Sequence, residues 1–232
     1  MPDFSIRTLL PEKMDQPGVA EAEIRQALHE LEIINNLLGG NHVTLDALQK
    51  FDSHETTLTI MDLGCGGGDM LRVIAKWASK NKKNVKLIGV DWNPVMTSYA
   101  KEKSTDIPGI RFLTMNVFDD SLLIEKADIT MNTLFCHHFD TDELTELIQR
   151  MYRLASRGVI INDLHRHWFA YYSIKVITWL FSKTYLVRYD GPLSVARALS
   201  RKEWKFILAK AGITNYSLRW MWAFRWQIII QK

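Results

Sequence analysis

Two patterns of hydrophobic residues alternate along this chain, short continuous apolar runs and segments with helical spacing. Short, nearly continuous apolar runs are typical of strands covered on both faces of a sheet, and they predict strands at 57–63, 85–91, 110–116, 128–135 and 158–164. Segments in which apolar residues recur at helical spacing separate these runs. Because strands that alternate with helices need parallel crossover connections, the pattern predicts a doubly wound α/β sheet.

The predicted helices flank and follow these strands. Residues 19–38 place Ile24, Leu28 and Leu31 at helical spacing, and Gly39-Gly40 is a fitting end for that helix. Further helices are predicted around 43–51, after the glycines at 64–68, from Pro94 onward, and at 140–155, 167–183 and 200–211. The closing residues, "ITNYSLRWMWAFRWQIIIQK", predict two strands with a tight connection. We find no linker or internal repeat and therefore expect one domain, residues 1–232.

Composition and charge exclude several classes of protein. The chain has 232 residues, of which 47% are hydrophobic and 24% charged, as in ordinary globular domains. The net charge is only +3, and the basic run "KNKKNVK" at 80–86 fits a solvated loop better than a nucleic-acid footprint. Residues 168–181 are apolar but include Lys175 and are too short to span a bilayer, which needs about 20 apolar residues. We predict neither nucleic-acid binding nor a transmembrane segment.

Two further observations bear on the compartment. Cys65 and Cys136 fall inside predicted core elements and lack the spacing of zinc ligands, so we interpret them as reduced thiols. The first residues carry early acids and no apolar core of a signal peptide. A cytoplasmic location is expected on these grounds.

The stretch "TIMDLGCGGGDML", residues 59–71, joins a strand to a helix through four glycines. A dinucleotide-binding G-x-G-x-x-G motif would need glycine where Asp69 stands, and a phosphate-binding loop would need a Lys-Ser/Thr pair that is absent. Two more acids, Asp62 and Asp91, end the first two strands. Ligands of open α/β sheets bind beyond the strand ends, where these three acids lie. Because acids repel phosphates, the site suits a ligand with positive charge and hydroxyl groups.

The motif acid-x-G-x-G-x-G, formed by Asp62, Gly64, Gly66 and Gly68, together with Asp91 in "GVDWNP", resembles class I S-adenosylmethionine-dependent methyltransferases. Within that family the chain looks most like the small-molecule branch, of the secondary-metabolism or quinone type. The resemblance covers residues 55 to 165 well and the C-terminus more loosely. It implies a Rossmann-like, mostly parallel seven-stranded sheet with an antiparallel C-terminal hairpin, preceded here by a helical extension.

The resemblance also implies S-adenosylmethionine as the cofactor and assigns residues to it. Asp91 would accept hydrogen bonds from both ribose hydroxyls, and Trp92 would pack on the adenine. The ammonium end of the methionine moiety would face Asp62, with Asp69 as a further acid beside it. Where the family usually has an acid that reads the adenine amine, this chain has Asn116, with the Val117 backbone beside it. Residues Thr133 and Leu134 would line the cofactor near its methyl group.

The segment "TLFCHHFDTDEL" follows the fourth strand, where this family places the reaction. It lacks the Asn-Pro-Pro-Tyr type of signature, which argues against methylation of nucleobases. We expect one of the adjacent residues His137 and His138 to act as a general base, a role that histidine suits near neutral pH. In the other interpretation they cap the helix beginning near Asp140 or pack beneath the pocket.

Other polar residues leave alternatives open. Asp163 and His165, in "NDLHRHW" after the fifth strand, are alternative bases. Metal-dependent methyltransferases of the catechol type need an acid just after the fourth strand, where this chain has His137-His138, so we predict no metal.

The family division implies a helical lid at 1–55, a cofactor-binding core at 56–165, an aromatic helical insertion at 166–200, and a helix with the terminal hairpin at 201–232. The insertion is dense in aromatic residues and is predicted to form the acceptor pocket, unless its aromatic side chains simply pack on the sheet. We expect a small aromatic or phenolic acceptor, hydrophobic or carrier-bound, and favour O-methylation. A C-methyltransferase of quinone or polyketide type and a non-catalytic binding module are the alternatives. The sequence does not indicate an oligomeric state.

Overall fold

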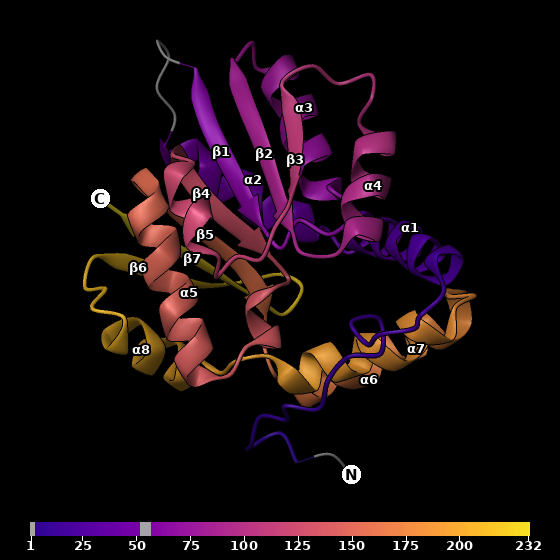
Figure 1. Ribbon diagram of the computed structural model, residues 1–232. Coiled ribbons are helices and arrows are strands. Elements are labelled where there is room, and N and C mark those ends of the chain that lie inside the picture. The colour runs from indigo at the N-terminus through magenta and orange to yellow at the C-terminus, as the bar shows by residue number, and fades with distance from the viewer. Residues whose placement is uncertain (1–2, 52–56) are drawn as a thin grey trace.

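The computed structural model of the protein describes residues 3–51 and 57–232. Its centre is a seven-stranded sheet with the strand order β3-β2-β1-β4-β5-β7-β6 (Figure 1). The strands are β1 (Leu58–Leu63), β2 (Val85–Asp91), β3 (Ile110–Thr114), β4 (Ala127–Thr133), β5 (Ala155–Leu164), β6 (Tyr216–Met221) and β7 (Arg225–Gln231). Strands β1 to β5 pair in parallel, and β7 runs antiparallel to both β5 and β6. The predicted doubly wound sheet with an antiparallel C-terminal hairpin is confirmed.

Helices cover both faces of this sheet. They are α1 (Glu21–Leu37), α2 (Gly40–Leu48), α3 (Asp69–Lys80), α4 (Pro94–Lys103), α5 (Thr141–Leu154), α6 (Trp168–Phe181), α7 (Tyr185–Arg197) and α8 (Arg201–Lys210), with short 3₁₀ turns η1 (Gln49–Phe51), η2 (Asp120–Ile124) and η3 (Cys136–His138). Successive strand residues point to opposite faces. Ile60 and Leu87 therefore pack with α2 and α3, whereas Met61 and Ile88 pack in the core that α5 and α8 close.

Local capping explains where two of these helices begin. The Asp140 carboxylate accepts hydrogen bonds from the backbone N–H groups of Asp142 and Glu143, and the Glu143 side chain accepts one from the Asp140 N–H. Ser200 and Glu203 form the same reciprocal capping box at α8. Such caps stabilise a helix by about 1 kcal/mol. The N-cap of α5 is therefore Asp140. His137 and His138 do not cap this helix.

Helix α7 is absent from the sequence-based assignment, because Gly191-Pro192 in its middle is a strong signal for a break. The helix nevertheless continues through Pro192. Apolar side chains on both sides of this point, Leu186, Val187 and Val195, are buried. Their packing holds both halves of the helix in one line and outweighs the local preference.

The N-terminal helices are joined to the sheet by buried hydrogen bonds. The Arg225 guanidinium donates to Asn35 Oδ1 of α1 at 3.1 Å and to Asn162 Oδ1 of β5 at 3.4 Å. The Asn162 amide donates in turn to the Gly40 carbonyl oxygen of α2 at 3.0 Å, and the Gln227 amide donates to that of Val43 at 2.8 Å. Helices α1 and α2 are therefore fastened to β5 and β7.

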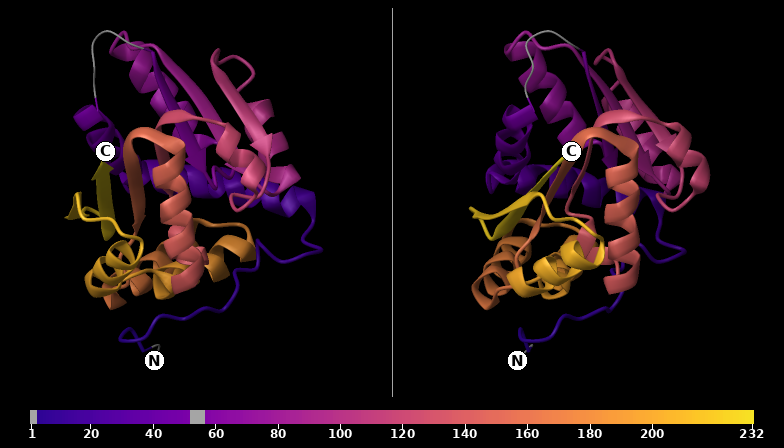
Figure 2. Two further views of the ribbon diagram at one scale, coloured as in Figure 1. Left: turned by 60° about the vertical axis from the view of Figure 1, so that its left-hand side comes forward. Right: turned by 90° about the vertical axis from the view of Figure 1, so that its left-hand side faces the viewer.

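The segment before α1 runs below the sheet from the chain end to that helix (Figure 2). Residues 12–15 of this segment, which we call the strap, are held by α7. The Asp190 carboxylate accepts hydrogen bonds from the backbone N–H groups of Lys13 at 2.8 Å and Met14 at 3.0 Å, and Ser194 Oγ donates to the Glu12 carboxylate at 2.7 Å. Among the helices of the described residues, none has the length and apolarity that crossing a membrane requires.

Candidate active site

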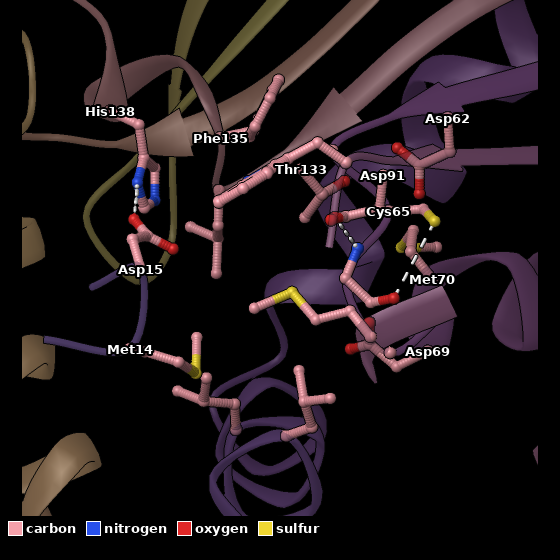
Figure 3. A pocket seen from close by; sticks show the side chains of 18 of the residues that line it. Met14, Asp15, Asp62, Cys65, Asp69, Met70, Asp91, Thr133, Phe135 and His138 are labelled. Atoms are coloured by element: carbon pink, nitrogen blue, oxygen red, sulfur yellow. Dashed lines mark hydrogen bonds and ion pairs between the residues drawn. The ribbon is translucent and has the colours of Figure 1, made fainter. Parts of the chain in front are cut away.

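A cavity of about 460 Å³ opens at the carboxyl ends of the central strands (Figure 3). It lies where β1 pairs with β2 on one side and β4 on the other, the point where the strand order reverses and where α/β sheets bind ligands. Helix α1 and the strap form its opposite wall. The sequence-predicted residues that line it are Asp62, Gly64, Gly66, Asp91, Trp92, Asn116, Val117, Thr133, Leu134 and His138.

Three glycines of the turn after β1 have positive φ angles, and two show why glycine is needed. At Gly64, with φ +73°, a Cβ atom would lie 2.3 Å from the Phe135 ring. At Gly66, with φ +50°, a Cβ atom would meet only Leu28 Cδ2 at 3.9 Å and would project into the cavity. Gly68 instead precedes α3 as its N-cap residue and does not line the cavity. Glycine thus leaves room for a ligand against the backbone of this turn.

Asp91, at the end of β2, fixes the glycine turn from across the cavity. Its Oδ2 accepts a hydrogen bond from the Gly66 N–H at 2.9 Å, and its Oδ1 accepts one from the Asn93 N–H at 2.9 Å. Burial raises the pKa of this carboxyl above its usual value. The cap of α4 is Asn93, whose Oδ1 accepts from the Val95 N–H, so capping does not explain Asp91. Each carboxylate oxygen keeps a second lone pair that a ligand hydroxyl can use.

Two further acids concentrate negative charge in the cavity. Asp62 is buried, and its Oδ1 has no hydrogen-bond partner. Burial, with the charges of Asp69 and Asp91, raises the pKa of Asp62 well above its usual range. Burial also raises the pKa of Asp69. Because a buried carboxylate without a partner is costly, this group of acids fits a cationic ligand such as the ammonium and sulfonium of S-adenosylmethionine.

The other end of the cavity has an aromatic side chain and an amide. Trp92 lines the cavity and is 60% exposed. Val117 also lines the cavity and is buried. Asn116 Oδ1 accepts a hydrogen bond from the Phe118 N–H at 2.9 Å. A carbonyl oxygen has two lone pairs, so Asn116 retains one acceptor position for an exocyclic amine.

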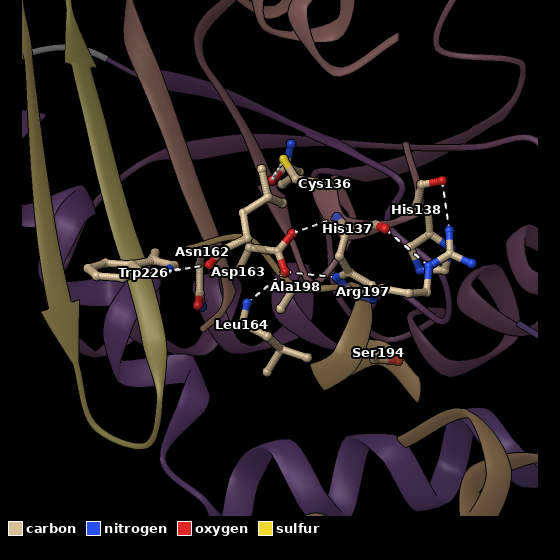
Figure 4. Close-up of polar contacts among 12 residues, drawn as sticks. Cys136, His137, His138, Asn162, Asp163, Leu164, Ser194, Arg197, Ala198 and Trp226 are labelled. Carbon is tan, nitrogen blue, oxygen red and sulfur yellow. Dashed lines mark hydrogen bonds and ion pairs between the residues drawn. The ribbon is translucent and has the colours of Figure 1, made fainter. Parts of the chain in front are cut away.

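Of the two candidate bases, His137 does not line the cavity. It is buried beside Asp163, as Figure 4 shows, with Nδ1 2.8 Å from Asp163 Oδ1. On its other side Nε2 lies 3.4 Å from Glu12 Oε1. Burial opposes its protonation, but Asp163 and Glu12 together raise the pKa of His137 to about 9. Both ring nitrogens of His137 thus face carboxylates rather than the cavity.

The surroundings of His137 form a buried ionic cluster. Its carbonyl oxygen accepts hydrogen bonds from Arg7 at 2.8 Å and Arg197 at 3.1 Å. Burial opposes ionisation of Glu12, but His137 and His138 lower the pKa of this carboxyl to about 2. Donor atoms of Glu12, His137 and His138 lie within 4.8 Å of one another, a spacing that a metal ion could also use. Here the proton on His137 and the guanidinium of Arg197, 4.0 Å from Glu12, supply positive charge to the cluster.

His138, the second candidate, lies on the cavity wall. Its Nδ1 is 2.8 Å from Asp15 Oδ2, and the two side chains face each other in Figure 3. Because a carboxylate only accepts hydrogen bonds, Nδ1 is the donor, and Nε2 is left with a free lone pair in the neutral ring. Asp15 is not among the residues predicted from the sequence. It lies 123 positions before His138 in a segment without periodicity, and nothing local marks it as a partner.

The alternative bases lie elsewhere. Asp163 is fully buried and engaged by His137. His165 directly follows β5 in the chain. Burial, and then the positive charges of His167 and Arg166, lower the pKa of His165 to about 4. Neither residue lines the cavity.

The aromatic insertion does not form the wall expected of it. None of residues 166–200 lines this cavity, and many of their aromatic side chains face solvent. The sequence shows that the segment is aromatic, but a helix that points these side chains outward gives the same pattern. The apolar part of the cavity wall comes instead from the strap, from α1 and from the turn after β4, through Met14, Leu28, Leu31, Phe135 and Phe139.

The strand order, the glycine turn and the acids ending β1 and β2 define the class I fold of S-adenosylmethionine-dependent methyltransferases. Residues 60–158 match the model of the methyltransferase domain family. This match and the fold are those of S-adenosylmethionine-dependent methyltransferases. No match was found among curated protein sequences.

Solved structures share this fold. Human N-acetylserotonin methyltransferase in complex with S-adenosylmethionine is 17% identical, with a TM-score of 0.64 over 92% of this chain and 56% of that one. The plantazolicin methyltransferase in complex with S-adenosylhomocysteine is 14% identical, with a TM-score of 0.65 over 91% and 96%. A candidate O-methyltransferase of Nostoc punctiforme PCC 73102 is 15% identical, with a TM-score of 0.63 over 96% and 64%. The chain thus spans less than two thirds of the human and Nostoc proteins, and at these identities the likeness concerns the fold.

Proposed function

We propose that the protein transfers the methyl group of S-adenosylmethionine to a hydroxyl group of a small, hydrophobic, aromatic or phenolic acceptor. The observation that supports this most is the pair of His138 and Asp15 on the cavity wall, with Nδ1 and Oδ2 2.8 Å apart. In this proposal His138 is the general base, and Asp15 positions it.

The cofactor would lie along the acid-lined side of the cavity. When bound, it supplies an electrophilic methyl group on a sulfonium. Asp62 and Asp69 would balance its positive charge, and the free lone pairs of Asp91 would accept from the ribose hydroxyls. Trp92 and Asn116 would contact the adenine.

The acceptor would lie against the apolar wall. Met14, Leu31 and Phe135 provide an apolar surface for a flat ring. As the acceptor oxygen bonds to the methyl carbon and the carbon–sulfur bond breaks, His138 Nε2 would take the hydroxyl proton. The Asp15 carboxylate would stabilise the imidazolium so formed. Glu12 Oε2, 3.9 Å from Nε2, adds a second negative charge beside it.

The substitution His138→Gln tests this role. It should leave S-adenosylmethionine affinity unchanged and lower turnover by about 10²–10⁴-fold, the usual contribution of a positioned base. Transfer of labelled methyl groups to a panel of phenols and quinols provides the assay. Raising the pH should partly rescue a phenolic acceptor, because phenols ionise near pH 10 on their own.

Two further variants sharpen this test. Asp15→Asn keeps the shape but removes the charge, and should lower turnover by a smaller factor with the same pH rescue. His165→Gln alters a histidine outside the cavity and should leave turnover unchanged. Full turnover of His138→Gln at every pH would refute the assignment, and a product methylated at carbon would replace O-methylation by the C-methyltransferase alternative.

We also propose the cytoplasm as the site of action, because both cysteines are free and buried, as in proteins of reducing compartments. Residues 1–55 are proposed to act as a cover of the cavity, since Leu28 of α1 and Met14 of the strap contribute to its wall.

A further inference from the structure

Helix α6 points its apolar side chains toward solvent and its small ones toward the protein. Ala170 and Thr178 are buried, whereas Trp179 and Phe181 are 68% and 76% exposed. Helices of soluble domains normally show the reverse arrangement. The outward side chains, which we call the aromatic face, are Trp168, Phe169, Tyr172, Val176, Trp179, Leu180 and Phe181.

The β6–β7 hairpin extends this aromatic face. The Phe224 ring lies 5.8 Å from that of Phe169 and 5.8 Å from that of Trp220, measured between ring centroids. Trp222 follows at 6.2 Å from Phe224, and both tryptophans are exposed. A continuous apolar surface of this kind is rare on soluble monomers and marks a site of interaction.

The charged residues of α6 and of the segment that follows it are basic. No Asp or Glu lies between Asp163 and Asp190 in the sequence, and both of these acids are buried. Lys175 within α6, Lys183 after it and Arg188 in α7 are exposed. A partner that covers the aromatic face must therefore offer an apolar surface bordered by negative charge.

We propose that the aromatic face docks on the surface of an anionic phospholipid bilayer. Helix α6 would lie parallel to the membrane plane, with its Trp, Tyr and Phe side chains among the headgroups and upper acyl chains. Interfacial helices combine these residues with basic side chains in this way, and tryptophan and tyrosine favour the membrane–water interface. Each basic residue near an anionic surface contributes to the attraction.

A second copy of this chain fits the aromatic face less well. A two-fold contact buries the same surface of both copies, so Lys175 and Lys183 of each copy would border one apolar contact. The segment between Asp163 and Asp190 carries no acid that could pair with them, so like charges would meet at the rim of this contact. Lipid phosphates supply the negative charge that a second copy lacks.

The strap connects the cavity to exposed tyrosines of α7, the helix that directly follows α6 in the chain. Lys13 Nζ lies 5.1 Å from the ring centroid of Tyr185 and 4.3 Å from that of Tyr189, two exposed residues of α7. The next two residues, Met14 and Asp15, line the cavity. An amphiphilic acceptor could therefore reach the cavity from the membrane surface. The docking itself does not depend on the role proposed for His138.

Vesicle flotation of the full chain tests the proposal. The protein should float with vesicles of equal parts phosphatidylcholine and phosphatidylglycerol, and less with phosphatidylcholine alone. The double substitution Trp179→Ser/Leu180→Ser should lower partitioning by about tenfold or more, because two buried apolar side chains are lost from the lipid contact. Lys175→Glu/Lys183→Glu should lower binding to the anionic vesicles by about tenfold or more. The control Leu37→Ser/Ile124→Ser changes two exposed aliphatic residues outside the aromatic face and should float as the unaltered chain does.

Three results would overturn the proposal. They are absence of flotation, equal flotation of all variants, and a dimer in sedimentation without lipid that Trp179→Ser/Leu180→Ser dissociates. The altered side chains are solvent-exposed, so the variants should keep the unfolding temperature and the S-adenosylmethionine affinity of the unaltered chain. If the unaltered chain floats but does not bind S-adenosylmethionine, the proposed function fails and the docking stands.

Discussion

Gly66 combines a left-handed backbone with a position open to the cavity. Its φ of +50° disfavours any other residue, and a side chain there would project toward the space assigned to the methionine moiety. The Gly66 N–H group donates a hydrogen bond to the carboxylate of Asp91, which ends the neighbouring strand β2. A single residue thus links the end of β2, the turn after β1 and the ligand.

The substitution Gly66→Val separates the backbone effect from the steric one when a matched control accompanies it. Gly212 has a φ of +78° and no atom within 4 Å of a Cβ built on it, so Gly212→Val adds similar strain outside the cavity. We expect Gly66→Val to abolish S-adenosylmethionine binding in calorimetric titration, while Gly212→Val binds like the unaltered chain. Equal affinities of the two variants would show that the turn does not contact the cofactor.

At the scale of elements, the sequence predicts the parts whose signals are local. The buried strands, the glycine turn and the acids ending β1 and β2 each occupy one short segment, so composition and periodicity reveal them. Helix α7 was missed because packing overrides the break signal of Gly191-Pro192. The outward direction of α6 and the partnership of Asp15 with His138 were not predictable, because each depends on which distant element lies opposite.

The cluster around His137 ties the element η3 to β5 and to the strap, and its strength should depend on pH. The folded pKa of His137, about 9, exceeds the ordinary value of 6.5, so its stabilisation is complete below pH 6.5 and is lost as the pH rises through 9. The pKa of Glu12 is lowered from 4.5 to about 2, so its contribution is present above pH 4.5 and is lost as the pH falls through 2. Together these groups stabilise the fold most between about pH 4.5 and 6.5.

Urea unfolding at a series of pH values checks this dependence. The free energy of unfolding should fall by about 3 kcal/mol or less between pH 6.5 and 9 through His137 alone. The variant His137→Gln should be less stable at pH 6 and should lose this decline. His29→Gln, at an exposed position of α1, is the control and should keep it. A decline of the same size in both variants would exclude His137 as its source.

At the scale of the whole molecule, the N-terminal helices behave as part of the sheet rather than as an appendage. The buried guanidinium of Arg225 joins α1 to β5 and β7, and Asn162 carries the connection on to α2. Burial lowers the pKa of Arg225 to about 10, so it stays charged at neutral pH. Hydrogen bonds to a charged group contribute about 1.5–3 kcal/mol.

Replacing Arg225 should loosen this connection specifically. In Arg225→Met we expect amide hydrogen exchange to accelerate in α1 and α2 by about tenfold or more, while α5 on the opposite face keeps its protection. Arg111→Met is a control, because Arg111 is an exposed residue of β3 whose ion pair with Glu125 does not involve α1 or α2. Uniform acceleration throughout the protein would indicate global destabilisation and contradict a local joint.

With α1 and α2 fastened to the sheet, the strap is the part of the cavity wall outside the helices whose movement would exchange ligands. It is held by the Asp190 carboxylate, by Ser194 and by the cluster around His137. The strap also carries Asp15, the partner of His138. Each opening that exchanges ligands would therefore separate Asp15 from His138, and each closing would bring the two residues together again. Turnover should then become slower in viscous solvents, because the pace of the cycle is set by a moving segment rather than by the breaking of a bond.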